Sequence, residues 1–598
     1  MQTGAGPHDT YLHCLAERNQ SLDALERRRD RIGNLRLLVA LAAVATIWYE
    51  FHGLSLWWLA FPVGLFIALV WWQSRVERSA ECMRRAVRFY EQGITRLENR
   101  WHGTGESGER FGDPHHPYAS DLDLFGRSSL FELLSTARTR GGEARLAAWL
   151  KAASPIAELI ERHSAIDELR PGLDMREQIA VLGEDFRAGV DPDRLSKWAA
   201  EPAKPFPVWQ RRIALVLSII GLATLLWWMG TDLTDPNAGL AVIVMALIEG
   251  AFGYRMRARV MRILSTVEEP GRDLDLLSGV LESIEKQPFA SARLAALRSA
   301  IHAGNGTASH QISRLRRLTD MVESLESPLI RAIGPLVLWG TQVAMALEQW
   351  RTENGAHVAA WLDAVSEMEA LSSLANYSWE HPADPFPELA EANRPGLLEG
   401  EDMRHPLLPE DRSVPNSVSL ADPLRLLIVS GSNMSGKSTL LRTIGVNTVL
   451  ALAGGPVRAK RLRISHLALG ASIRTVDSLE EGHSRFMAEI LRLKQVLELP
   501  PPSLFLLDEL LHGTNSHDRA IGSEGLVRAL LDRGAIGLVT THDLALSRVA
   551  DDLGPLAANV HFEDRLEGGR LVFDYRLRPG VVERSNALDL MRAVGLDV

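Results

Sequence analysis

The chain has 598 residues, enough for several domains. Hydrophobic residues make up 46% and charged residues 23% of it, a balance that excludes wholesale disorder. The formal net charge of −10 argues against a surface coated with basic residues for constant contact with nucleic acid, although it leaves room for a local basic path. The two cysteines, Cys14 and Cys82, indicate neither a disulfide framework nor a metal site.

Four apolar segments occur in two pairs, at residues 35–51 and 54–72 and then at residues 213–229 and 238–254. Each is about 17 to 19 residues long, at the short end of what crosses a hydrocarbon core of roughly 30 Å. Tryptophan is typical of membrane interfaces, and the segment ends carry Trp48, Trp57, Trp58, Trp71, Trp72, Trp227 and Trp228. The sequence therefore predicts two transmembrane helical hairpins, at residues 35–72 and 213–254.

Arginines decide the predicted topology. They flank the outer end of every segment, whereas the inner connections, residues 50–53 and 230–239, contain no Lys or Arg. By the positive-inside rule, both hairpins enter from the cytoplasm and return to it. Two buried hairpins of a soluble protein are the alternative. We expect a multi-pass protein of the cell membrane whose cytoplasmic parts are residues 1–34, 76–210 and 260–598.

Two features of the apolar regions need a separate interpretation. Glu249 lies near the cytoplasmic end of its segment, so we expect its carboxylate to reach toward the membrane interface. Residues 332–347 are also apolar, but they contain Gly334-Pro335 and Gln342. We therefore expect a buried soluble helix there and not a fifth membrane span.

The remaining residues up to about 400 read as helical. Apolar residues recur at helical spacing over residues 129–150, where Gly141-Gly142 predicts a break, and again over 272–301 and 363–377. Residues 101–120 are rich in Gly, Pro and His and predict a loop. These patterns predict two helical regions, residues 76–210 and 260–400, on either side of the second hairpin.

A nucleotide-binding motif follows in the C-terminal part. A short apolar strand at 424–430 leads into GSNMSGKS at residues 431–438 and then into a helical pattern at 439–452. This strand, loop and helix is the setting of a phosphate-binding loop, in which backbone N–H groups and a lysine surround the phosphates of ATP. The nucleotide-binding residues that we expect are Gly431, Asn433, Met434, Ser435, Gly436, Lys437, Ser438 and Thr439.

Two later strands end in polar residues that complete this site. The strand at 503–507 ends in Asp508-Glu509, and the strand at 538–541 ends in His542-Asp543. Ser438 and Asp508 are the expected Mg²⁺ ligands, since Mg²⁺ prefers oxygen. Glu509 is the expected base for the attacking water, and His542 is expected to orient or sense the γ-phosphate.

The motifs together resemble the MutS family of DNA mismatch repair ATPases. GSNMSGKST at 431–439 resembles its phosphate-binding loop, and DELLHGTNS at 508–516 resembles its Asp-Glu segment. DSLEEGHSRFMAE at 477–489 resembles its signature segment, and the similarity extends over residues 404–598. The resemblance implies an α/β P-loop NTPase of the ABC/MutS type at 404–598. It also implies a preceding all-α core and lever region. The predicted fold thus combines this region with the two transmembrane hairpins, of which the first precedes the core-like residues and the second lies within the lever region.

The resemblance also implies a site completed by a second copy of the chain. In this family the signature serine, here Ser484, contacts the γ-phosphate bound to the partner, so we expect a homodimer. The family's mismatch-recognition domain has no counterpart here, and VPNSV at 414–418 lacks the aromatic residue that stacks on adenine in the family. We expect a membrane-anchored MutS-like ATPase with a clamp-like cycle, related to mismatch repair and acting on double-stranded DNA. The alternative is a switch that acts on a protein or membrane partner; an ABC transporter is disfavoured by the signature segment.

Overall fold

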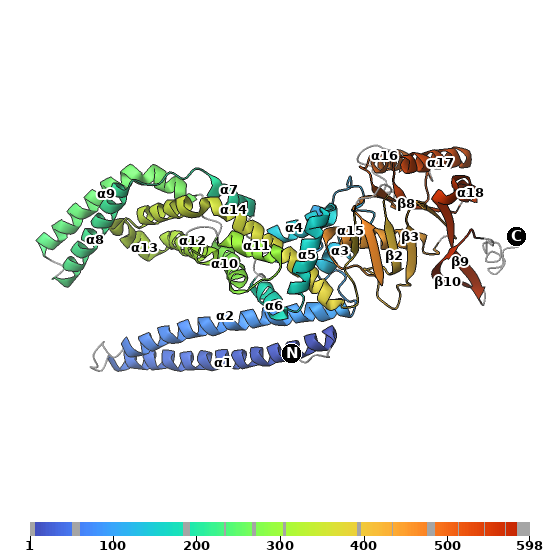
Figure 1. Ribbon diagram of the computed structural model, residues 1–598. Coiled ribbons are helices and arrows are strands. Elements are labelled where there is room, and N and C mark those ends of the chain that lie inside the picture. The colour runs from blue at the N-terminus through green and yellow to red at the C-terminus, as the bar shows by residue number, and fades with distance from the viewer. Residues whose placement is uncertain are drawn as a thin grey trace.

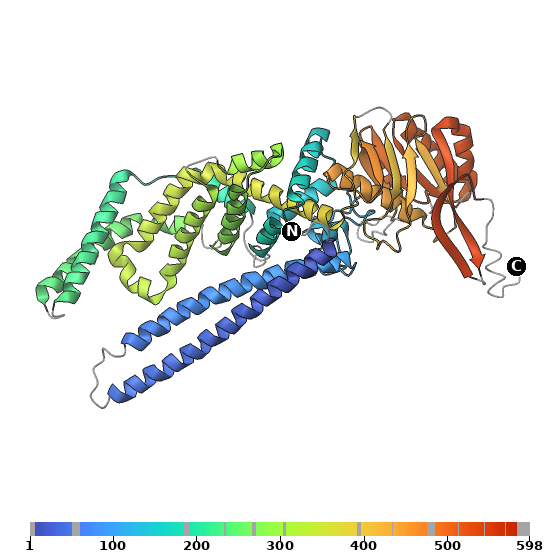
Figure 2. The same ribbon diagram turned by 60° about the horizontal axis from the view of Figure 1, so that its bottom comes forward.

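The computed structural model describes residues 6–50, 60–182, 192–231, 235–265, 271–302, 306–391, 396–432, 434–474, 485–511, 514–542, 544–567 and 570–582. The molecule is elongated, with an α/β part at one end and two helical hairpins that extend away from it (Figure 1). In both views the two hairpins extend toward the same end of the molecule (Figure 2).

The first hairpin pairs α1 (Pro7–Glu50) with α2 (Ala60–Leu97), and the second pairs α8 (Val208–Gly230) with α9 (Pro236–Ser265). Three described helical stretches are long and apolar enough to cross a membrane, namely residues 7–48, 208–230 and 236–265. Large apolar side chains on these helices are exposed; Leu37 is 63% exposed and Leu247 is 69% exposed. Such faces need an apolar environment or a partner.

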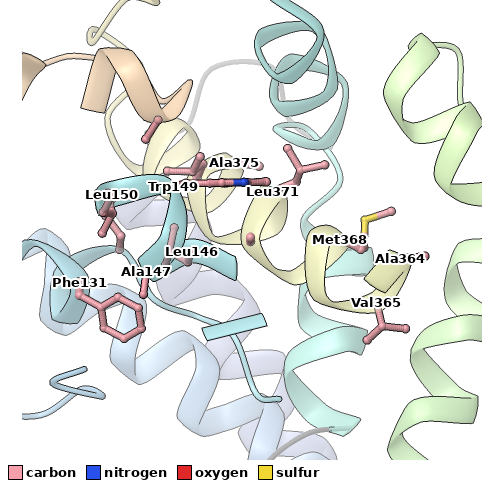
Figure 3. Close-up of a cluster of buried hydrophobic side chains, with 14 of the residues drawn as sticks. Phe131, Leu146, Ala147, Trp149, Leu150, Ala364, Val365, Met368, Leu371 and Ala375 are labelled. Atoms are coloured by element: carbon pink, nitrogen blue, oxygen red, sulfur yellow. The ribbon is translucent and has the colours of Figure 1, made fainter. Parts of the chain in front are cut away.

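The helical middle is built around one long helix, α14 (Trp339–Glu380). Leu146 and Leu150 of α4 pack with Phe131 of α3 in a core that faces Met368 and Leu371 of α14 (Figure 3). The other helices of this part are α3 (Leu130–Leu134), α4 (Arg140–Lys151), α5 (Ile156–Leu169), α6 (Leu173–Leu182), α7 (Pro192–Ala200), α10 (Gly271–Lys286), α11 (Ala292–Ile301), α12 (Ala308–Glu323) and α13 (Pro328–Ile333). Short 3₁₀ helices are η2 (Glu109–Phe111), η4 (Ser324–Glu326) and η5 (Gly334–Val337).

The predicted break at Gly141-Gly142 is wrong. The chain leaves helix after Leu134, and α4 begins at Arg140, so both glycines lie in its first turn. Thr139 caps α4 by accepting a hydrogen bond from the N–H of Gly142. A Cβ on Gly142 would lie 2.8 Å from the Cβ of Glu369. Glycine therefore serves close packing of α4 on α14 and does not interrupt the helix.

Two further expectations about helices are corrected. Residues 332–347 do not form one helix, because α13 ends at Ile333, η5 contains Pro335, and α14 begins at Trp339. Residues 272–301 divide into α10 and α11. Glu249 does not reach outward, since its side chain is turned into the molecule and is only 1% exposed.

The α/β part contains two sheets. The larger sheet has the strand order β10-β9-β4-β8-β7-β6, with parallel pairing except between β9 and β10. Its strands are β4 (Leu426–Ser430), β6 (Ala468–Ser472), β7 (Ser503–Leu507), β8 (Ile536–Thr541), β9 (Ala557–Glu567) and β10 (Arg570–Pro579). The smaller sheet has the order β1-β5-β2-β3, from β1 (Glu388–Ala390), β2 (Leu398–Met403), β3 (Asn416–Leu420) and β5 (Arg461–Ser465).

Both faces of the larger sheet are covered, which explains its continuous apolar strands. Leu426 and Ile428 of β4 point to the face covered by α16 (Arg485–Leu497), α17 (Ser516–Asp532) and α18 (Leu544–Leu553). Leu427 and Val429 point to the opposite face, where α15 (Lys437–Ala453) and the main core lie. This alternation has the period of two that a strand imposes.

Candidate nucleotide-binding site

The predicted phosphate-binding loop connects β4 to α15 at the carboxyl edge of the larger sheet. Gly436 caps α15 with a φ of 103°, and Met434 has a φ of 70° and is 86% exposed. Gly431 allows a close approach, since a Cβ there would lie 2.8 Å from the Oγ of Ser435. Left-handed residues in such a loop turn successive N–H groups inward, and α15 adds a helix N-terminus.

Lys437 is buried at the start of α15. Its ammonium donates to the carbonyl oxygens of Gly431, at 2.8 Å, and Ser432, at 2.9 Å. The same nitrogen lies 3.7 Å from Oε1 of Glu509. Burial lowers the pKa of Lys437 below its ordinary value, and the carboxylates of Glu509 and Asp508 oppose this shift. The lysine is thus a cation held inside the loop.

Ser438 and Asp508 are in direct contact. The hydroxyl of Ser438 donates to Oδ2 of Asp508 at 2.5 Å, although β8 lies between β4 and β7. The other carboxylate oxygen, Oδ1, accepts a hydrogen bond from the hydroxyl of Thr540 at the end of β8. A hydroxyl next to a carboxylate is an oxygen pair that suits Mg²⁺.

Glu509 lies between the loop and His542. Its backbone has a φ of 47°, and its N–H donates to Oγ1 of Thr540 at 3.1 Å. Its Oε1 lies 3.6 Å from Nδ1 of His542, whose side chain is 44% exposed. Glu509 and His542 also line a cavity of about 20 Å³, which is room for one water.

The structure therefore brings together most of the predicted site residues. Thr439 is exposed on the first turn of α15, and Ser435 is buried behind the loop. Two predicted residues, Asn433 and Ser484, lie outside the described residues. In the described part of the chain, no three His, Cys, Asp or Glu residues form a metal-binding group. Mg²⁺ that binds together with ATP needs only one or two protein carboxylates, so Asp508 with Ser438 fits that role.

Sequence reasoning missed an aromatic residue beside the loop. Tyr575 of β10 is 43% exposed and has a φ of 54°, at an irregularity in the pairing with β9. A Cβ on Gly436 would lie 3.1 Å from its ring. The amide of Asn416 donates to the carbonyl oxygen of Tyr575 at 2.9 Å and accepts from the N–H of Leu577 at 2.7 Å. Asn416, within the segment 414–418, thus fixes the backbone that carries this aromatic ring.

Glu489, the last residue of the signature-like segment 477–489, supports the backbone of the site. Its side chain is 6% exposed, and its Oε1 accepts a hydrogen bond from the N–H of Leu511 at 2.6 Å. Leu511 has a φ of 55° and follows the Asp508-Glu509 pair by two residues. Glu489 therefore fixes the backbone directly after the two acids, a role that spacing in the sequence does not reveal.

A lysine, a serine, two acids and a histidine thus meet at the carboxyl edge of a largely parallel sheet, in an α/β domain that follows a helical region. Residues 427–597 match the family described as MutS domain V. This match supports kinship with the MutS family for the C-terminal part of the chain.

Curated relatives agree with this match. Endonuclease MutS2 of Thermus thermophilus is 35% identical over 201 residues, which cover 32% of this chain and 25% of that protein. DNA mismatch repair protein MutS of Shouchella clausii is 30% identical over 239 residues, 39% of this chain and 27% of that protein. DNA mismatch repair protein MutS of Natronomonas pharaonis is 30% identical over 290 residues, 47% of this chain and 31% of that protein. The chain thus spans about a quarter to a third of the length of these relatives.

Proposed function

We propose that the chain is a membrane-anchored MutS-like ATPase that binds ATP with Mg²⁺ and hydrolyses it to drive a clamp-like conformational cycle. The convergence of Lys437, Ser438, Asp508 and Glu509 at one edge of the sheet carries this proposal. Kinship with the MutS family supports it.

The site residues have separate roles in this proposal. Lys437 binds the β- and γ-phosphates, and Ser438 with Asp508 holds Mg²⁺, which neutralises phosphate charge when it is bound. Glu509 accepts the proton of the attacking water, and His542 orients Glu509 or the γ-phosphate. Tyr575 offers a ring on which the adenine can stack.

The second half of the site comes from a partner in this proposal. The described residues 431, 432, 434–438, 508 and 509 surround one side of a bound triphosphate, and the far side of the γ-phosphate needs further donors. By resemblance, Ser484 and the helix that follows it supply them from a second copy of the chain. Exposed Met487 and Leu491 on α16, 44% and 48% exposed, are consistent with a contact surface there.

The membrane anchorage rests on the hairpins. Three described stretches are long and apolar enough to span a bilayer, and both hairpins extend to the same end of the molecule (Figures 1 and 2). With arginines at the outer flanks, this supports a protein of the cell membrane whose α/β domain is cytoplasmic.

A direct test compares ATP binding and turnover in purified wild-type protein and two variants. Lys437→Ala should lose nucleotide binding, because the phosphate charge is no longer matched. Glu509→Gln should bind ATP but turn it over on the order of 100-fold more slowly, since a carboxamide is a poor base. Normal turnover by Glu509→Gln would refute the assignment of the base.

What the clamp closes on is a separate question. The relatives named as DNA mismatch repair proteins favour double-stranded DNA. The net charge of −10 and the hairpins favour the alternative, a switch that acts on a protein or membrane partner. Binding of duplex DNA measured across a salt series separates the two. A DNA-binding clamp should lose affinity steeply as salt rises, whereas a switch for another partner should show no binding at moderate salt.

A further inference from the structure

The first hairpin carries a group of arginines next to its apolar half. Residues 27–36 of α1 and 71–78 of α2, here called the arginine neck, lie on helices that run side by side in both views (Figures 1 and 2). Toward the tip of the hairpin the exposed side chains become large and apolar, such as Leu38 and Ile67, which are 63% and 62% exposed. The arginine neck therefore lies at a boundary between apolar and polar surface, which is the level of the headgroups in a bilayer.

The positive charge of the arginine neck is not balanced within the described chain. The neck contains seven arginines and two acids, Asp30 and Glu77. Both acids lie near the same arginine, Arg29, with N–O distances of 3.2 Å and 3.8 Å. Among the described residues, no carboxylate forms an ion pair with any of the other six arginines. Basic residues next to a membrane-spanning segment attract anionic lipids, so the neck favours an anion at this level.

Two of these arginines lie over consecutive tryptophans. The guanidinium carbon of Arg75 lies 3.9 Å from the ring centroid of Trp71, and that of Arg28 lies 5.2 Å from the ring centroid of Trp72. Both arginines are exposed. A guanidinium stacked on a ring is held in place, and its N–H edge can still donate two parallel hydrogen bonds to phosphate oxygens. The two pairs therefore present prepositioned phosphate donors at one level of the hairpin.

We propose that the arginine neck binds the headgroup of an anionic phospholipid, with Arg28 and Arg75 donating to its phosphate. The proposal rests on the proposed membrane anchorage but does not depend on ATP hydrolysis. Phosphatidylcholine carries the same phosphate together with a quaternary ammonium group. The arginines repel that cation, so a headgroup without it is the better ligand.

The experiment places the full chain in nanodiscs that contain equal amounts of phosphatidylglycerol and phosphatidylcholine. The discs are dissolved in a mild detergent, the protein is purified, and the lipids that remain bound are quantified by mass spectrometry. We expect phosphatidylglycerol to be enriched about tenfold over phosphatidylcholine on the wild-type protein. Equal retention of the two lipids by the wild type would overturn the proposal.

Three double variants distinguish a headgroup site from attraction by overall charge. Arg28→Gln/Arg75→Gln should lower the enrichment at least fivefold. Arg28→Lys/Arg75→Lys keeps the charge but loses the stacked, two-pronged donors, so it should lower the enrichment at least threefold. Arg461→Gln/Arg463→Gln on β5 removes the same charge at 52% and 48% exposed side chains of the α/β part, and should leave the enrichment unchanged. Wild-type enrichment in either neck variant, or an equal loss in the β5 variant, would overturn the proposal.

Nanodiscs of phosphatidylcholine alone separate this proposal from the anchorage on which it rests. Wild-type protein that does not enter these discs would refute the anchorage and, with it, the headgroup site. Protein that enters them but shows no preference in the mixed discs would refute the headgroup site alone. The same elution volume and helical circular dichroism as the wild type show that each variant is folded.

Discussion

Asp508 is held by two hydroxyl groups, and one of them comes from a residue that no motif marks. Thr540 is fully buried at the end of β8. Its hydroxyl donates to Asp508 and accepts from the N–H of Glu509 at 3.1 Å. One side chain therefore positions the expected Mg²⁺ ligand and the backbone of the expected base.

We predict that Thr540→Val weakens the affinity for Mg²⁺·ATP or the turnover by about 10–100-fold, as loss of a group that orients a metal ligand commonly does. Valine keeps the shape but leaves Asp508 and the N–H of Glu509 each with one partner fewer. Thr540→Ser retains the hydroxyl and should restore most of the activity. Steady-state ATP hydrolysis at several Mg²⁺ concentrations measures the effect. Wild-type kinetics in Thr540→Val would show that Asp508 does not need this support.

His405 predicts a pH dependence of stability. It is 7% exposed, its Nδ1 accepts from the N–H of Leu407 at 3.2 Å, and burial, with a smaller contribution from Arg442, lowers its pKa to about 4. A histidine in the unfolded chain has a pKa near 6.5. Between these values the unfolded state binds more protons, so stability is retained above about pH 6.5 and is lost as the pH falls toward 4.

His405→Asn keeps an acceptor but removes this titration. Wild-type protein should lose about 1 kcal/mol more than the variant between pH 7.5 and 5.5, measured by urea unfolding in detergent. Burial also lowers the pKa of His163 to about 4, but this residue is common to both proteins and cancels in the difference. The same pH dependence in both proteins would contradict the assignment.

The sequence was sufficient to predict that the candidate residues after the strand ends lie close together. Lys437, Ser438, Asp508 and Glu509 belong to short motifs directly after apolar strands, and parallel strands bring their carboxyl ends to one edge. Thr540 and Tyr575 could not be predicted in this way. Their roles depend on strand order and on an irregular pairing of β10 with β9, which are long-range features.

At the scale of elements, the sequence pattern located the strands and the helix next to the site motifs, but it did not locate the smaller sheet or every helix boundary. The predicted strand 503–507 coincides with β7, and the predicted helix 439–452 lies inside α15. The glycine pair at 141–142 led to a wrong prediction of a helix break. Glycine is needed at 142 because the side chain of Glu369, which is distant in sequence, packs against it. The expectation that Glu249 reaches outward was wrong for a similar reason, since a sequence pattern does not reveal which face of α9 is covered.

The hairpins carry a prediction about topology. Alkaline phosphatase, which is active only outside the cytoplasm, should be active when fused at Gly53 or Asp235, because arginines are absent from both inner connections and present at the outer flanks. Gly53 lies outside the described residues, whereas Asp235 directly precedes α9. A fusion at Glu201, after α7, is the control and should be inactive. A cytoplasmic signal at Gly53 or Asp235 would refute the corresponding hairpin.

At the scale of the whole molecule, α14 connects the parts. Its 42 residues span about 63 Å. Trp339 at its beginning lines a cavity formed with α9, and Glu380 at its end pairs with Arg96 of α2 at 2.6 Å. Tyr11 of α1 also donates to Glu380, at 3.0 Å. The α/β part is therefore linked to both hairpins through one continuous helix.

The central claim is that two chains complete one ATP site, with Ser484 acting across the dimer. Membrane anchoring would favour this dimer by confining both chains to one plane. Lys437→Ala removes the lysine that we propose binds phosphate, and Ser484→Arg blocks the donor that the resemblance assigns to the partner. Each variant alone should be inactive, because every homodimer site contains its defect.

The decisive measurement is ATP hydrolysis by an equal mixture of these two variants after subunit exchange. One of the two sites in each mixed dimer combines an intact Lys437 with an intact Ser484, so we predict recovery to about a quarter of wild-type activity. An inactive mixture in which mixed dimers are demonstrated, or normal hydrolysis by Ser484→Arg alone, would contradict the account.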